Sequence, residues 1–158
     1  MKQDKIILDA CCGSRMFWFD KENPLALYQD IRSENHILCD GRKLEIKPDV
    51  IADFRKMPHA DNSFKLVVFD PPHLEKAGEN SWLAKKYGKL SPTWKEDLKQ
   101  AFSECFRVLE PNGILIFKWN EDQIKVREIL SLTDVRPLFG HTTGRHGKTH
   151  WITFLKQV

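Results

Sequence analysis

Short apolar runs occur along the chain, and five of them have the length of buried β-strands. They cover residues 5–9, 25–30, 50–53, 66–70 and 114–119. Compact apolar runs of this length are typical of strands in a parallel sheet that is covered on both faces. Four of the five runs end in aspartate, at positions 9, 30, 53 and 70. Ligands of open α/β sheets bind outside the carboxyl ends of the strands, so this row of acids predicts a binding site.

A helical period appears after the fourth run. Ser91 and Pro92 have the residue types of an N-cap followed by a first-turn proline. Apolar residues then recur every three or four positions and form one stripe: Trp94, Leu98, Ala101, Phe102, Cys105, Val108 and Leu109. Further on, Asn120 and Gln123 have the spacing of a capping box, which predicts a second helix that runs to about Leu132.

The connections between the early strands are too short or too irregular for full helices. Residues 10–24 leave room for about one turn of helix, and residues 31–48 have no helical period. Residues 135–138 and 150–155 predict a final antiparallel pair around a loop rich in glycine, histidine and basic residues. The pattern therefore predicts an α/β fold with a mostly parallel sheet of about seven strands, a C-terminal antiparallel hairpin and truncated early helices.

Length and composition narrow the class of protein. The 158 residues, 41% of them hydrophobic, fit one globular domain, 1–158. No apolar run approaches the roughly 20 residues of a membrane span, and the N-terminus lacks a secretory signal, so we expect a cytoplasmic protein without a membrane partner. Adjacent Cys11 and Cys12 suit neither a disulfide framework nor zinc. The spacing of His141, His146 and His150 matches no known ligand pattern, so no metal is expected.

The charge of the chain is concentrated at its C-terminal end. The net charge is +3, but residues 135–158 contain no Asp or Glu and carry four basic residues, so the remainder sums to −1. This asymmetry indicates an anionic partner at that end. Arg145 and Lys148 lie in the glycine-rich loop there, and we expect them to contact phosphate groups.

A turn of small residues follows directly on the first run, with the sequence Asp9-Ala10-Cys11-Cys12-Gly13-Ser14-Arg15. Small residues let backbone N–H groups approach a ligand closely, but the glycine spacing is not a dinucleotide fingerprint. The segment resembles motif I of class I, Rossmann-like S-adenosylmethionine (SAM) dependent methyltransferases. It is most similar to the D-P-x-C-G-S-G version of enzymes that methylate nucleic acids. The resemblance implies SAM contacts from Asp9, Ala10, Cys11, Cys12 and Gly13, while Ala10 and Arg15 depart from the family pattern.

Asp70-Pro71-Pro72-His73 follows the fourth run. It resembles motif IV of amino-methyltransferases, (D/N/S)-P-P-(Y/F/W). The lone pair of an exocyclic amine is delocalised into the base, and a carboxylate together with a carbonyl held by two rigid prolines can accept both N–H groups. The fourth residue normally stacks on an extruded base, and His73 replaces the usual aromatic residue. The resemblance implies that these four residues are catalytic.

Two further acidic positions fit the same family. Asp30 lies where the resemblance places a carboxylate on the ribose hydroxyls, and a carboxylate can accept both O–H groups of a cis-diol. Asp53 and Phe54 resemble the pair that contacts the adenine amine and ring. Residues 57–67 resemble the LP-x-x-DNSFDLV connection of the superfamily. The implied cofactor is therefore SAM.

Basic and aromatic residues near the fourth and fifth runs are candidate substrate contacts. Lys118 suits either the steering of an anionic substrate or activation of a ribose hydroxyl, as in lysine-containing 2′-O-methyltransferases. Trp82, Tyr87 and Trp94 are interleaved with lysines 76, 85, 86, 89 and 95, a mixture that suits base stacking and phosphate contact. Arg145 and Lys148 complete the set of predicted substrate contacts.

Our leading hypothesis is a SAM-dependent methyltransferase that acts on an exocyclic amine of a base in DNA or RNA. The length leaves no room for a separate target-recognition domain, so a protein partner or a homo-oligomer stays open. A first alternative is methylation of a ribose hydroxyl or a small molecule, which His73 and Lys118 favour. A second alternative is a non-catalytic SAM-binding subunit, against which the intact Asp70-Pro71-Pro72 argues.

Overall fold

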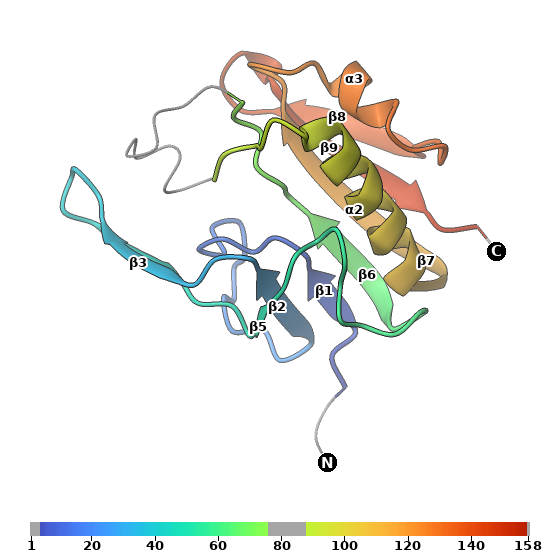
Figure 1. The fold of residues 1–158 in the computed structure, drawn as a ribbon, viewed down its shortest axis with the longest axis horizontal. Coiled ribbons are helices and arrows are strands. Elements are labelled where there is room, and N and C mark those ends of the chain that lie inside the picture. Colours follow the sequence, from blue (N-terminus) through green and yellow to red (C-terminus); the bar gives the residue numbers. More distant parts are fainter. Residues whose placement is uncertain (1–3, 76–87, 158) are drawn as a thin grey trace.

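The computed structural model describes residues 4–75 and 88–157, and its centre is a seven-stranded sheet with the order β5-β2-β1-β6-β7-β9-β8 (Figure 1). Its strands are β1 (Ile7–Asp9), β2 (Ala26–Asp30), β5 (Val50–Ile51), β6 (Phe64–Phe69), β7 (Leu109–Asn120), β8 (Phe139–Thr143) and β9 (Thr149–Leu155). The strands from β5 to β7 are parallel, whereas β9 runs antiparallel to both β7 and β8. The predicted fold class is confirmed.

One face of the sheet is covered by helix α2 (Trp94–Val108). The predicted stripe is buried, and alternate residues Leu115, Phe117 and Trp119 of β7 belong to the same core. The helix begins at Trp94 rather than at Pro92. Ser91 is therefore not the N-cap; its hydroxyl donates to the Asp97 carboxylate at 2.6 Å. Leu109 begins β7 instead of ending the helix, so it shares the core from the strand side.

The opposite face carries Tyr28, Lys118 and Trp151, which belong to the sheet but not to the core under α2. Residues 10–24 form an irregular segment on it, as their shortness predicted. Their aromatic side chains contact the sheet, because the Trp18 and Tyr28 ring centroids lie 5.0 Å apart and those of Phe17 and Trp151 5.4 Å apart. These contacts take the place of a helix over part of this face.

A β-hairpin that the sequence did not predict occupies the connection between β2 and β5. It consists of β3 (Glu34–Ile37) and β4 (Lys43–Ile46), and it extends away from the main sheet (Figure 1). Each strand has only four residues, and β3 mixes polar and apolar positions without a buried side chain. So short a segment has too few positions for a two-residue period to be read.

Two expectations about the C-terminal part were wrong. The predicted second helix is reduced to α3 (Val126–Leu130), because Asn120 belongs to β7 and accepts the Asp122 N–H at 3.0 Å, and Gln123 accepts the Glu75 N–H at 2.6 Å. The strand expected at 135–138 is β8, which lies farther along the chain and is exposed throughout, so it has no buried alternation to read. The short 3₁₀ helix η1 (Arg145–Gly147) joins β8 to β9. In the described ranges, no helix is long and apolar enough to span a membrane.

Candidate cofactor and active site

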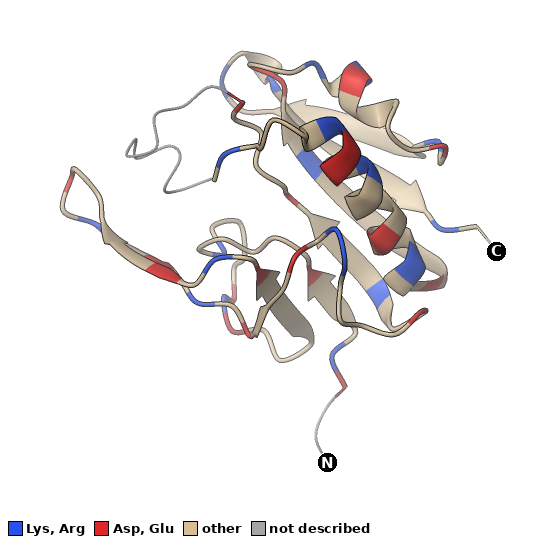
Figure 2. Cartoon of the chain, in the orientation of Figure 1, with Lys and Arg blue, Asp and Glu red and all other residues tan. Residues whose placement is uncertain are grey.

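Three aspartates gather at the carboxyl ends of neighbouring strands. Asp9 ends β1, Asp30 ends β2, and Asp70 directly follows β6; Figure 2 marks the acidic positions at the ends of β1 and β2. They converge because β1 lies between β2 and β6 and all three strands run in the same direction. Asp9 and Asp30 are 0% and 1% exposed. Buried carboxylates need hydrogen-bond partners or a ligand, so this edge of the sheet is the candidate site.

A cavity of about 310 Å³, here called the cofactor cavity, opens beside Asp30, between the strand ends and the start of α2. Five predicted cofactor residues line it: Ala10, Cys11, Asp30, Asp53 and Phe54. Ile31 and Pro72 also line it, and Ile31 is 62% exposed, so the wall offers apolar surface to a flat ring. Carboxylates can accept hydrogen bonds from the ribose hydroxyls, and apolar walls suit the adenine ring, so the lining suits the adenosine part of SAM. The cavity has the size of a small-molecule site.

Asp30 also organises the motif I turn. Its Oδ2 accepts the Gly13 N–H at 2.8 Å, and its Oδ1 accepts the Arg32 N–H at 2.9 Å. The Arg32 guanidinium lies 3.6 Å from Oδ1. Each carboxylate oxygen has further acceptor capacity, so these bonds leave room for ribose hydroxyls. Ile31 and Arg32 were missed by the sequence analysis, although residues just after a strand end are natural candidates for this edge.

Asp53 and Phe54 are held by neighbours of different kinds. Asp53 accepts hydrogen bonds from the Arg55 guanidinium at 2.7 to 3.1 Å, and these bonds are the main reason that its pKa is lowered. Phe54 packs edge-to-face on the core residue Phe69, with the ring centroids 5.5 Å apart. The pair is therefore a fixed part of the cavity wall, as a preorganised adenine contact requires.

Asp9 lines neither this cavity nor the three described below. It accepts the indole N–H of Trp18 at 2.7 Å and the backbone N–H of Cys11 at 3.4 Å. Burial raises its pKa to about 7, although the Trp18 hydrogen bond opposes that rise. Asp9 thus fixes the geometry of the motif I turn from beneath, and its predicted direct contact with SAM stays a prediction.

Asp9→Asn is expected to change how stability depends on pH. The folded protein holds the Asp9 proton up to about pH 7, whereas an unfolded aspartate releases it near pH 4. The folded state therefore binds more protons in this window, and stability falls as the pH rises through it. At about 1.4 kcal/mol per pKa unit, the wild type should lose roughly 2 to 3 kcal/mol more than the variant between about pH 5 and about pH 8. Urea unfolding at both pH values measures this, and parallel losses would contradict the assignment.

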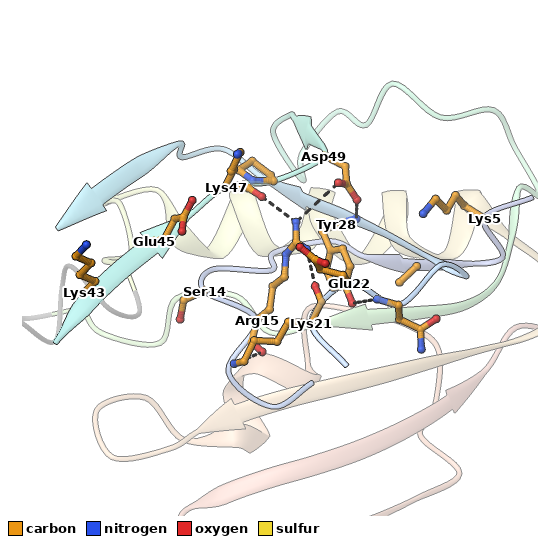
Figure 3. A pocket seen from close by; sticks show the side chains of 13 residues that line it. Lys5, Ser14, Arg15, Lys21, Glu22, Tyr28, Lys43, Glu45, Lys47 and Asp49 are labelled. Atoms are coloured by element: carbon orange, nitrogen blue, oxygen red, sulfur yellow. Dashed lines mark hydrogen bonds and ion pairs between the residues drawn. The ribbon is translucent and has the colours of Figure 1, made fainter. Parts of the chain in front are cut away.

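Arg15 does not obstruct the cofactor cavity. Its φ of +61° is in the left-handed region, where glycine is the usual residue. Its guanidinium lies over the Tyr28 ring, 3.7 Å from the centroid, and donates to the carbonyls of Lys21 at 2.5 Å and Lys47 at 2.8 Å (Figure 3). It crosses a separate cavity of about 590 Å³ whose lining mixes five basic with three acidic residues. Arg15 thus fastens the motif I turn to the end of β4.

Two further cavities lie on the Asp70 side of the strand ends. A cavity of about 30 Å³ separates Cys11, Cys12 and Gly13 from Asp70, Pro71 and His73. A larger one of about 350 Å³, here called the acceptor cavity, shares Asp70 and His73 with it. It brings together five predicted residues: Asp70, His73, Lys118, Arg145 and Lys148. Asn120, Asp122 and Thr149 also line it and were not predicted, and His146 of the predicted basic loop lines it as well. Pro72 faces the cofactor cavity instead, so the Asp-Pro-Pro segment spans from one cavity to the other.

The electrostatics of this cavity are set by burial and by Lys118. The Lys118 Nζ lies 3.6 Å from Asp70 Oδ2. Burial raises the pKa of Asp70 to about 6, and the lysine limits that rise. Burial lowers the pKa of His73 to about 4, with Lys118 adding to the effect, so His73 is neutral near pH 7. Its ring meets Trp119 edge-on, with the centroids 6.2 Å apart.

Some predicted residues are engaged elsewhere or lie outside the described ranges. The Lys148 Nζ forms a 2.9 Å ion pair with Asp122, and Arg145 is exposed in η1. His150 lies 3.0 Å from Glu121 rather than beside other histidines. Over residues 4–75 and 88–157, no three His, Cys, Asp or Glu side chains are placed to hold a metal. Trp82 and Tyr87 belong to residues 76–87, which the structure does not describe.

Comparison with known proteins identifies the fold. No protein-family model matches the chain. The biotin biosynthesis bifunctional protein BioHC of Saccharophagus degradans is 26% identical over 162 residues, which cover 98% of this chain and 25% of that protein. The chain thus spans about a quarter of the length of this relative.

Many solved structures match over nearly the whole chain, and two of them illustrate the fold. A TehB-like SAM-dependent methyltransferase from Corynebacterium glutamicum has a TM-score of 0.60 at 15% identity, with 98% of this chain and 82% of that one covered. A SAM-dependent methyltransferase from Methanosarcina mazei has a TM-score of 0.58 at 12% identity, with coverage of 100% and 95%. The fold is that of the Rossmann-like, class I SAM-dependent methyltransferases.

Proposed function

We propose that this protein transfers a methyl group from SAM to an exocyclic amine of a base in DNA or RNA. The observation that carries the proposal is the position of Asp70-Pro71-Pro72, with Pro72 in the wall of the cofactor cavity and Asp70 in the wall of the acceptor cavity. SAM supplies a methyl group that its positive sulfonium activates. An amine that is hydrogen-bonded to Asp70 is held at the junction of the two cavities.

The residues of the acceptor cavity suit each requirement of this chemistry. The Asp70 carboxylate accepts an amine N–H, and the rigid prolines fix the backbone carbonyl that accepts the second. Neutral His73 offers a flat ring beside Asp70 for stacking on an extruded base. Lys118 and Arg145 supply positive charge for a phosphate-bearing substrate. We propose further that a protein partner or a second copy of the chain supplies target recognition.

The proposal is tested by incubating the protein with isotope-labelled SAM and mixtures of DNA or RNA, and by analysing the released nucleosides by mass spectrometry. Label on an exocyclic nitrogen of adenine or cytosine is expected. Label only on ribose oxygen, or the absence of labelled nucleosides from both DNA and RNA, would overturn it. A reaction with the Asp70→Ala variant serves as the blank.

The basic C-terminal loop is expected to contact the phosphate backbone. On duplex DNA each neutralised phosphate contributes about −0.9 to the slope of log affinity against log salt, and about −0.7 on single strands. The double change Arg145→Ala and Lys148→Ala should therefore flatten the slope by roughly 1.4 to 1.8, and less if the Asp122 pair keeps Lys148 from phosphate. Lys65→Ala is a matched control, because Lys65 also pairs with one carboxylate but lies on β6, outside the acceptor cavity. An unchanged slope in the double variant would show that the loop does not contact the phosphate backbone.

Methylation of a small anionic molecule is the second candidate function. It is favoured by the ion pair between Lys118 and Asp70, by His73 at the position of the usual aromatic residue, and by an acceptor cavity of about 350 Å³. The name of the BioHC relative, which refers to biotin biosynthesis, points in the same direction. Incubation with labelled SAM and a small-molecule cell extract separates the two candidates. A labelled small product together with unlabelled nucleic acid would favour this one.

A further inference from the structure

The Lys118 ammonium lies between two aromatic rings and a carboxylate. Its Nζ is 5.4 Å from the Phe17 ring centroid, 5.3 Å from that of Trp151 and 3.6 Å from Asp70 Oδ2. Lys118 and Trp151 are paired residues of β7 and β9, and the Phe17 ring meets the Trp151 ring edge-on. The ammonium is therefore confined on three sides, and its side chain is only 22% exposed.

The three contacts come from different parts of the chain. Asp70 belongs to the candidate acceptor machinery, Trp151 belongs to the antiparallel part of the sheet, and Phe17 follows the motif I turn. Phe17 is two residues from Arg15, which is fastened to Lys21, Lys47 and Tyr28. The Lys118 ammonium thus connects the turn expected to hold the cofactor with the carboxylate expected to hold the substrate.

We propose that Lys118 is a positioning residue that keeps Asp70 in its carboxylate form, and that Phe17 and Trp151 hold it there. Through Phe17, the arrangement of the cofactor turn influences the charge of the acceptor carboxylate. The inference deepens the proposed function, because it rests on Asp70 as the group that accepts the amine N–H. Phe17 and Trp151 contribute through attraction of the cation to their ring faces and by excluding water from the ion pair.

The charges around Asp70 explain why it needs this cation. A protonated Asp70 would carry an O–H donor on one oxygen and no negative charge, so it would be a weaker acceptor for an amine N–H. Burial favours that protonated form and Lys118 opposes it, while buried Asp9 on the neighbouring strand keeps its own proton up to about pH 7. The other titratable groups in the walls of the two adjoining cavities are Cys11, Cys12, Asp30, Arg32, His73, Asp122, Arg145, His146 and Lys148. Lys118 is the cation that these contacts place within 4 Å of Asp70 among the described residues.

The proposal is tested without any methyl acceptor by measuring the pKa of Asp70 in carboxyl-¹³C-labelled protein by NMR, with Asp70→Asn identifying the signal. Lys118→Met is expected to raise this pKa by at least about one unit, and Lys118→Arg to leave it close to the wild-type value. Phe17→Leu and Trp151→Leu should raise it by a smaller amount. Phe19→Leu is the matched control, because Phe19 lies two residues from Phe17 and is fully exposed. An unchanged pKa in Lys118→Met, or equal values in Phe17→Leu and Phe19→Leu, would overturn the proposal.

Two further measurements test the coupling and its consequence. S-adenosylhomocysteine should shift the Asp70 pKa in the wild type and shift it less in Phe17→Leu; equal shifts would overturn the coupling. In methyl transfer, the acid limb of the kcat/KM profile should move to higher pH in Lys118→Met. The deficit of this variant in kcat/KM relative to the wild type should therefore shrink in alkaline buffer. A deficit that is the same at every pH would indicate a merely structural role. If the wild type methylates no nucleic acid, the proposed function fails, while the NMR titration still decides this inference.

Discussion

Asp70→Ala is expected to abolish methyl transfer while the affinity for SAM stays within about threefold of the wild type. Asp70 lies in the wall of the acceptor cavity and not in that of the cofactor cavity. Removing one preorganised group that acts on the reacting centre typically costs about 100- to 1,000-fold in kcat. Turnover by mass spectrometry and SAM affinity by calorimetry measure the two effects on the same preparation.

Asp70→Asn provides the matched control for shape. The amide has the size of the carboxylate but only one acceptor oxygen, and it carries no charge to pair with Lys118. A loss similar to that of Asp70→Ala would assign the effect to charge, and a small loss would assign it to hydrogen-bond geometry. Wild-type turnover in both variants would remove Asp70 from the reaction.

Asp30→Ala is expected to weaken SAM binding at least tenfold. Hydrogen bonds from the ribose hydroxyls to a buried carboxylate contribute about 1.5 to 3 kcal/mol each, and either one alone corresponds to at least about a tenfold change. The substitution also leaves the Gly13 and Arg32 N–H groups without their acceptor, which loosens the motif I turn. Calorimetry measures the affinity, and thermal unfolding shows whether the fold is retained.

Asp30→Asn separates the two contributions. Its amide oxygen can still accept from Gly13 or Arg32, so the turn is better preserved while the second acceptor and the charge are lost. Asp53→Asn is a useful comparison, because Asp53 lines the same cavity but is engaged by the Arg55 guanidinium. Wild-type affinity in both Asp30 variants would show that the cofactor binds elsewhere.

The sequence predicted the parts of the fold that depend on local periodicity. The runs that became β1, β2, β6 and β7 are buried strands whose apolar side chains have no alternative to the core. The stripe of α2 was readable because an amphipathic helix repeats its buried positions every three or four residues. Short or fully exposed elements, such as β3 and β8, carry no such signal.

By itself, the sequence determined that aspartates end four of the apolar runs and that two prolines and a histidine follow Asp70, because these are facts of chain order. Only the tertiary structure decided which of these residues meet. Strand order placed Asp9, Asp30 and Asp70 together, and the antiparallel return of β9 put Trp151 beside Lys118. The Arg15 side chain lies over the Tyr28 ring in a separate cavity, and not in the cofactor cavity. Contacts between residues distant in sequence depend on how strands pair and how loops pack, which no local pattern of residues records.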